Sequence, residues 1–191
     1  MSDYEKELEY VFEKANERFL KTNPLLFEMN VSERTLCGAL MLELHEVLKD
    51  TKYAEYFVDV EYNRNKGGKL KTFRKTIKGP SEEIVTITCD LIVHSRGQNV
   101  LRDNLIALEM KKSTRNQMDK ERDKIRLGCL TMEPEDNVWS YGGKALPEHV
   151  CGYGLGIYYE VNLKENCFSI EYYAKGHRYR CYKGRLSSNN S

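Results

Sequence analysis

The chain lacks a long apolar stretch: no run approaches the ~20 residues that a membrane-spanning helix needs. Its polar, acidic first residues do not resemble a signal peptide. The six cysteines are scattered, and in a chain without an export signal they are expected to be reduced, buried thiols rather than disulfides. There is no Cys-x-x-Cys pair, and the spacing of Cys and His residues matches no compact zinc module. These absences predict a cytoplasmic protein without a membrane partner.

The chain also lacks an excess of charge of one sign. Its 30 Lys and Arg residues nearly balance 29 Asp and Glu residues, so the net charge is +1 and any surface for nucleic acid must be local. There is no glycine-rich phosphate loop and no Ser, His or Cys nucleophile signature. With 191 residues, 40% of them hydrophobic, the chain is long and apolar enough for one domain with a real core.

The N-terminal part is predicted to be helical. Apolar residues recur at spacings of three and four up to Phe19, and Asn23-Pro24 ends this pattern. A second helix is expected to begin after Ser32, which suits an N-cap. We therefore predict an accessory helix at 1–22, a single domain at 23–186 and a disordered tail at 187–191.

The remaining elements are predicted to be strands around one further helix, so the expected fold class is α/β. Strands are expected at residues 56–64, 84–94 and 104–111, a helix at 115–131 with Ile125 and Leu130 on its apolar face, and a final hairpin at 152–162 and 167–174.

Three polar residues lie on two of these strands. Glu109 and Lys111 point to the same side, with Met110 facing away, because strand side chains alternate. A turn near residues 97–101 would place Asp90 opposite Glu109, about 5 Å away. Two carboxylates at such a short distance raise each other's pKa unless a cation lies between them. A hard divalent cation such as Mg²⁺ suits these oxygen ligands.

The Asp90…Glu109-x-Lys111 pattern resembles the PD-(D/E)XK nuclease superfamily, with Cys89 at the place of the family's proline. The resemblance covers roughly residues 32–174. That family has an αβββαβ core, with the Asp on the second core strand and E-x-K on the third, which agrees with the predicted element order. The resemblance therefore implies a restriction-endonuclease-like fold: a mixed central sheet flanked by helices, here with an extra N-terminal helix and a C-terminal β-hairpin.

The resemblance also implies roles for these residues. Asp90 and Glu109, with the carbonyl of Met110, would bind Mg²⁺ or Mn²⁺, and Lys111 would position or activate water. Glu33, on the apolar stripe of the first core helix, would hold a second metal or a metal-bound water. The expected reaction is metal-assisted hydrolysis of a phosphodiester bond. A second interpretation is equally well supported: Glu33 is an acidic residue at a helix N-terminus, where a negative charge is favourable.

A basic segment is the expected contact for nucleic acid, with DNA as the first candidate and RNA open. Its cations would follow a phosphate backbone, although a solvated hairpin explains the same composition. The residues expected to bind nucleic acid are Lys66, Lys69, Lys71, Arg74, Lys75, Lys78 and, beyond the segment, Arg115. Most other charged residues of 112–126 are interpreted as helix surface. A second basic cluster, in 175–185, lies among tyrosines that either stack on bases or pack in the sheet.

Two other functions stay open. One is a catalytically silent protein of the same fold that binds nucleic acid or a protein. The other is an oligomeric module, such as a homodimer, with the first helix as its contact.

Overall fold

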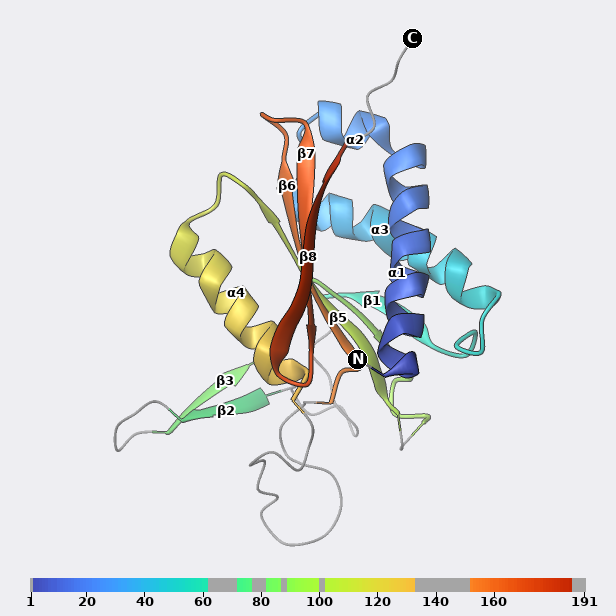
Figure 1. Cartoon of the computed structure of the whole chain (residues 1–191), viewed down its shortest axis with the longest axis vertical. Coiled ribbons are helices and arrows are strands. Elements are labelled where there is room, and N and C mark those ends of the chain that lie inside the picture. The colour runs from blue at the N-terminus through green and yellow to red at the C-terminus, as the bar shows by residue number, and fades with distance from the viewer. Residues whose placement is uncertain are drawn as a thin grey trace, which may run out of the picture.

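A computed structural model describes residues 2–61, 72–76, 82–86, 89–99, 102–132 and 152–186, and for 72–76 and 82–86 it describes only the backbone. These residues form an α/β fold, as the sequence predicts (Figure 1). The helices are α1 (Asp3–Thr22), α2 (Pro24–Glu28), α3 (Glu33–Lys49) and α4 (Gln117–Leu130). The strands are β1 (Phe57–Val60), β2 (Thr72–Thr76), β3 (Glu82–Thr86), β4 (Leu91–His94), β5 (Asn104–Lys112), β6 (Leu155–Asn162), β7 (Cys167–Ala174) and β8 (His177–Arg185).

A six-stranded mixed sheet forms the centre, in the order β1-β4-β5-β6-β7-β8. Only β5 and β6 run parallel; every other neighbouring pair is antiparallel. The strands β2 and β3 pair with each other in a separate two-stranded sheet. The helix α4 supplies the crossover between the parallel strands β5 and β6, a connection that needs an intervening element.

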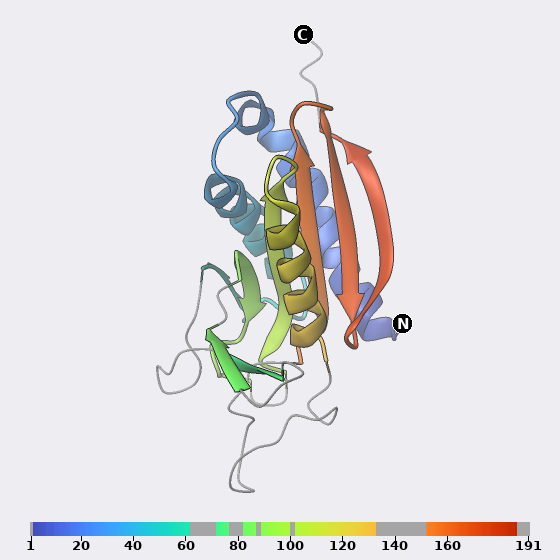
Figure 2. The same cartoon turned by 90° about the vertical axis from the view of Figure 1, so that its left-hand side faces the viewer.

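The helices cover both faces of the central sheet. In Figure 1 α4 lies on one side, and α1, α2 and α3 lie on the other; Figure 2 shows α4 in front of the sheet and the N-terminal helices behind it. The alternation of strand side chains matches this arrangement. Leu108 and Met110 of β5 belong to the large core under α1 and α3, while Ala107 faces a smaller core with Leu127 and Leu130 of α4.

The N-terminal helices begin where the sequence predicts. Ser2 caps α1 in a reciprocal capping box with Glu5, and the Ser32 side chain accepts a hydrogen bond from the Thr35 N–H at the start of α3. The apolar stripe of α1 is fully buried, and the ring of Phe12 contacts those of Tyr159 and Tyr172 edge-on. The first helix therefore shares one hydrophobic core with the sheet.

Several predicted boundaries are wrong. Residues 84–94 do not form one strand, because β3 belongs to the small sheet and β4 begins only at Leu91, in the central sheet. The final hairpin exists as β6–β7, but the edge strand β8 extends it. The edge strand β8 is rich in exposed Lys and Arg, so it lacks the apolar run that marks the inner strands β4 and β5. Ile125 is half-exposed rather than part of the apolar face of α4.

The described part of the chain contains no disulfide between Cys37, Cys89, Cys129, Cys167 and Cys181, in agreement with the prediction of thiols. Cys181 is exposed and so differs from the buried thiols that the sequence suggested. Within the same residues, no helix is both long and apolar enough to cross a membrane. The predicted tail at 187–191 lies outside the described residues.

Candidate functional site

The strand register brings Asp90 to Glu109 and Lys111. Leu91 pairs with Leu108 across the antiparallel β4–β5 ladder, so Asp90, one residue before β4, lies next to Glu109. Glu109 and Lys111 both reach residues of α4, while Met110 is buried on the opposite face. The sequence prediction of a shared face for Glu109 and Lys111 is thus confirmed.

The ammonium of Lys111 lies among oxygen atoms. Its Nζ is 3.2 Å from Asp90 Oδ2, 3.1 Å from Asp123 Oδ2 and 3.3 Å from the Met110 carbonyl oxygen. The Met110 N–H also donates to Asp90 Oδ2, at 2.8 Å. Burial acts to lower the pKa of Lys111, but the nearby carboxylates of Asp90, Asp123 and Glu109 outweigh it and raise the pKa. A positive charge is therefore strongly favoured at this point.

Glu109 is the most deeply buried acid of the site, with 1% of its side chain exposed. Its Oε1 accepts a hydrogen bond of 2.6 Å from Arg126 Nη1. Burial, followed by the charge of Asp90, raises the pKa of Glu109 to about 8, although Arg126 opposes this shift. The carboxyl group therefore keeps its proton more readily than an exposed glutamate does.

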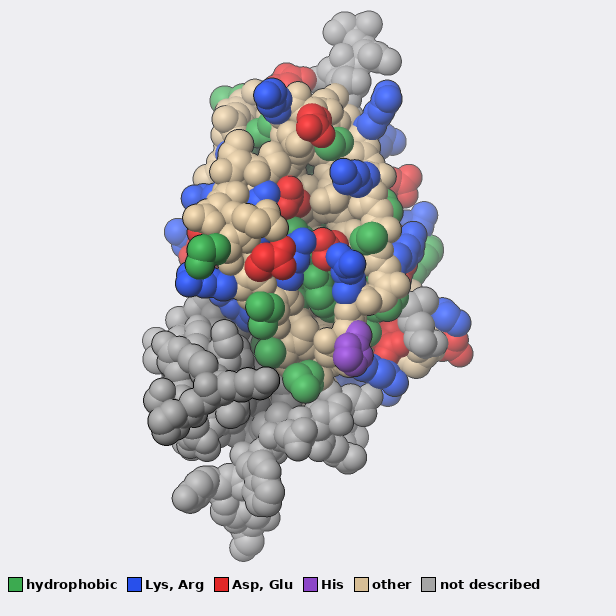
Figure 3. Space-filling model, turned by 60° about the vertical axis from the view of Figure 1, so that its left-hand side comes forward, with side chains coloured by type: hydrophobic (Ala, Val, Ile, Leu, Met, Phe, Trp, Pro, Cys, Tyr) green, Lys and Arg blue, Asp and Glu red, His purple; other side chains and the backbone are tan. Residues whose placement is uncertain are grey.

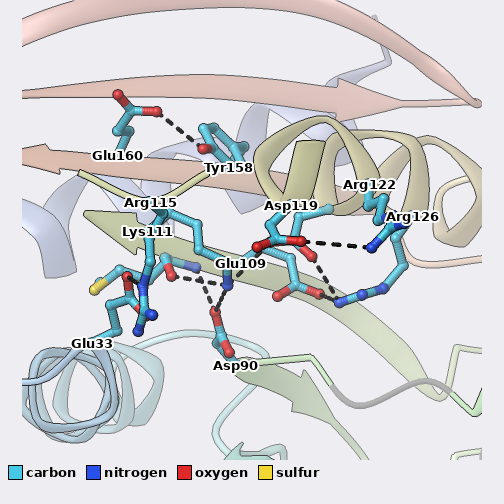
Figure 4. A network of polar contacts seen from close by, with 12 residues as sticks. Glu33, Asp90, Glu109, Lys111, Arg115, Asp119, Arg122, Arg126, Tyr158 and Glu160 are labelled. Atoms are coloured by element: carbon cyan, nitrogen blue, oxygen red, sulfur yellow. Dashed lines mark hydrogen bonds and ion pairs between the residues drawn. The ribbon is translucent and has the colours of Figure 1, made fainter. Parts of the chain in front are cut away.

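The helix α4 adds two charged residues that sequence reasoning missed. Asp123 lies 3.1 Å from both the Lys111 ammonium and Arg126, and it completes an alternating chain of charges, Asp90–Lys111–Asp123–Arg126–Glu109. Figure 4 shows how Asp90, Glu109, Lys111 and Arg126 converge between β5 and α4. Each charge has an opposite charge beside it, which offsets part of the cost of burial.

The interpretation of the charged residues on α4 as helix surface is wrong for two of them. Asp123 and Lys120 are buried, and Lys120 donates to the Ser113 carbonyl and pairs with Glu160. One signal was available in the sequence: Asp123 precedes the buried Leu127 and Leu130 by four and seven residues, so the three share one helix face.

Glu33 approaches the site from the start of α3, on the side of the sheet opposite α4. Its carboxylate accepts from the Lys112 N–H at 2.9 Å and takes two hydrogen bonds of 2.8 Å from Arg115. Partial burial acts to raise the pKa of Glu33, but Arg115 and the Lys112 N–H outweigh it and lower the pKa. Glu33 thus lines a cleft with Asp90 and another with Lys111, and its partner is an arginine.

Two clefts meet at the Glu33–Arg115 pair. The first, of about 240 Å³, is acidic and is lined by Ser32, Glu33, Arg34, Cys37, Glu61, Asp90 and Arg115. The second, of about 320 Å³, is richer in cations and is lined by Glu33, Lys111, Arg115, Asp119, Arg122, Asp123 and Arg126. Figure 3, which brings the α4 side forward, shows acidic and basic side chains interleaved on this face.

The oxygen atoms of the site are of the chemical type that binds a hard divalent cation. Such ions prefer carboxylate and carbonyl oxygens, and the Lys111 ammonium already lies between Asp90 and the Met110 carbonyl. As the side chains stand, the described residues contain no group of three or more Asp, Glu, His or Cys residues arranged for a metal. Lys111 and Arg126 contact the acidic oxygens, so a bound ion would have to displace or rearrange them.

The predicted contacts for nucleic acid lie mostly outside the described residues. This holds for Lys66, Lys69, Lys71 and Lys78 and for the side chains of Arg74 and Lys75 in β2. Of the residues predicted to bind nucleic acid, Arg115 has a described side chain, and it lines both clefts.

The tyrosines beside the second basic cluster pack in the sheet. Tyr172 and Tyr173 are buried, and Arg178 and Arg180 form ion pairs with Glu171 and Glu9. The packing interpretation of these tyrosines is therefore the correct one.

The fold and the site define an α/β protein with a compact, alternating network of charges between the sheet and α4. No family model, no curated protein and no solved structure matches the chain. A function must therefore be argued from the geometry of this network.

Proposed function

We propose that the protein is a divalent-metal-dependent nuclease that hydrolyses phosphodiester bonds in DNA, with RNA as the other substrate to test. One observation carries this proposal: a cation, the Lys111 ammonium, already lies between Asp90 Oδ2 and the Met110 carbonyl oxygen, beside the buried Glu109. These are the atoms that the PD-(D/E)XK resemblance assigns to the metal and to its catalytic lysine.

The element order supports the restriction-endonuclease-like part of the proposal. When the separate β2–β3 pair between β1 and β4 is left out, the element order α3, β1, β4, β5, α4, β6 follows the αβββαβ order of that core. Asp90 stands directly before the second of these strands, and Glu109 and Lys111 lie near the end of the third.

The proposed chemistry divides the work between acids and the ammonium. Asp90, Glu109 and the Met110 carbonyl would hold Mg²⁺ or Mn²⁺, and Glu33 would hold a second ion or a metal-bound water. The ion supplies charge that polarises the phosphate and a better nucleophile. Lys111 would orient the attacking water or stabilise the charge that develops on the phosphate. The reduced thiols fit the cytoplasm as the proposed compartment.

A specific observation favours a second candidate, a catalytically silent protein that binds nucleic acid. Glu109 and Glu33 each accept hydrogen bonds from an arginine, Arg126 and Arg115 respectively. A network that compensates its own charges can be a structural one. The two candidates differ in whether a divalent ion changes the molecule.

Cleavage of a panel of single-stranded and duplex DNA and RNA, with Mg²⁺ or Mn²⁺ and with chelator, separates the two candidates. We expect cutting with the ions only, and its loss in Lys111→Ala by about 10²-fold or more, because the ammonium acts in the transition state. The matched control is Lys112→Ala, since the neighbouring ammonium bonds to Asn30. Cutting by purified Asp90→Ala at the rate of the parent would overturn the proposal.

A further inference from the structure

The second cleft is the more cationic of the two clefts at the site. It lies between the start of α3 and one face of α4, and four of its seven lining residues are cations. Three of these are arginines, Arg115, Arg122 and Arg126. The four-residue interval places Arg122 and Arg126 on the same face of α4.

We propose that this cleft binds the phosphodiester backbone of a nucleic-acid strand, with Arg115, Arg122 and Arg126 as phosphate ligands beside Lys111. The identity of the anion rests on the proposed function. Arginine suits this role, because its planar guanidinium donates two parallel hydrogen bonds to a phosphate. The sequence pointed to Arg115 alone among these three.

Arg122 is the residue most available to a ligand. Its side chain is 68% exposed, and its ion pair with Asp119 is 3.6 Å long and joins two exposed groups. A pair of this kind contributes little free energy and is easily exchanged. The guanidinium can therefore turn to a phosphate without leaving a buried charge unpaired.

Arg115 and Arg126 connect the cleft to the acids. Arg115 uses Nε and Nη2 for Glu33 and is 59% exposed, so further N–H donors of its guanidinium remain for a ligand. Arg126 uses Nη1 for both Glu109 and Asp123 and is 26% exposed. A phosphate that draws these arginines toward itself would weaken their hold on carboxylates that the proposed metal needs.

Charge distinguishes this cleft from its neighbour. The first cleft presents the carboxylates of Glu33, Glu61 and Asp90, and Glu61 is already paired with Arg34. Acids concentrated there repel a phosphate, whereas the second cleft has more cations than acids. A strand bound in the second cleft would lie beside Lys111, where the proposed reaction takes place.

Binding of labelled single-stranded and duplex DNA and RNA, followed by fluorescence anisotropy in chelator over a salt series, tests this inference. We expect Arg122→Gln to weaken binding about three- to tenfold and to reduce the slope of log affinity against log salt by about 0.7 to 0.9, the loss of one phosphate contact. Charge reversal in Arg122→Glu should weaken binding further. The four probes show which strand type the cleft prefers.

Arg18→Gln is the matched control. Arg18 is 54% exposed and ion-paired with Glu43, and it lies on α1, across the sheet from α4. It should bind all probes as the parent does. Thermal melting of each variant confirms that it is folded.

Three results would overturn the inference: an Arg122→Gln protein with the same affinity and salt slope as the parent, an equal loss of affinity in Arg18→Gln, or no binding of any probe by the parent.

Failure of the nuclease proposal is recognised separately. An arginine-dependent cleft in a protein that never cuts keeps the phosphate site and removes the enzyme. Cutting by the parent with unchanged binding in Arg122→Gln keeps the enzyme and removes this cleft.

Discussion

At the scale of single residues, the site consists of buried and partly buried acidic and basic groups that pair with one another. Lys111 lies between Asp90 and Asp123, and Arg126 lies between Asp123 and Glu109. Removing one member would leave its neighbours buried without a partner, which is more costly than losing a surface ion pair. A ligand that supplies the missing charge can therefore bind strongly at this point.

The raised pKa of Glu109 predicts how metal binding depends on pH. In the metal-free protein its pKa is about 8, whereas a bound ion needs the carboxylate ionised. Binding must release this proton, so the apparent affinity for Mn²⁺ should rise about tenfold per pH unit from pH 6 to 8 and then level off. Calorimetric titration at several pH values measures this. Glu109→Gln should bind Mn²⁺ weakly, with no rise of affinity between pH 6 and 8. An affinity of the parent that does not change with pH would contradict the assignment of Glu109 as a metal ligand.

The sequence was enough to predict part of this site. Period-two alternation placed Glu109 and Lys111 on one face, and a hairpin placed Asp90 beside them. It did not reveal Asp123 and Arg126, because a charged residue on a helix is usually exposed. Their burial depends on partners from another element, and single-sequence patterns do not contain such distant pairings.

At the scale of elements, the site depends on how closely α4 lies against the sheet. Gly156 of β6 leaves room at the end of α4: an added Cβ would lie 2.9 Å from Cγ2 of Thr131, the C-cap of α4, 3.1 Å from Tyr173 Cβ on β7 and 3.5 Å from Leu127 Cβ on α4. Strand patterns predicted the central elements because these strands are nearly continuous apolar runs, as strands covered by helices on both faces are. They failed at residues 84–94, where the chain passes from the small sheet to the central one.

Two glycine substitutions test this element packing in opposite directions. Gly156→Ala should lower the free energy of unfolding by about 1–3 kcal/mol through overpacking against Thr131 at the end of α4 and Tyr173 on β7. Gly38→Ala in α3, where an added Cβ meets nothing within 4 Å, should raise it by about 0.5–1 kcal/mol through helix propensity. Urea unfolding measures both. A Gly156→Ala protein as stable as the parent would show that the contact with α4 is looser than described.

At the scale of the whole molecule, the site lies where three layers meet. Glu33 comes from the α3 layer, Asp90 and Glu109 from the sheet region, and Arg126 from α4 on the other side. The helix α1 packs its apolar stripe into the same core as the sheet. A ligand that binds Asp90 and Glu109 therefore stabilises the folded state as a whole, by a free energy that grows with the logarithm of its concentration relative to its Kd.

Titration of the parent protein with Mn²⁺, beside Asp90→Ala and Lys111→Ala, tests the central claim without knowledge of the substrate. We predict that the parent binds the ion, that Asp90→Ala loses binding by about tenfold or more because a carboxylate ligand is gone, and that Lys111→Ala binds at least as tightly as the parent because the competing ammonium is removed. Mn²⁺ should raise the melting temperature of the parent and of Lys111→Ala only. No binding by the parent, or equal binding by Asp90→Ala, would contradict the account.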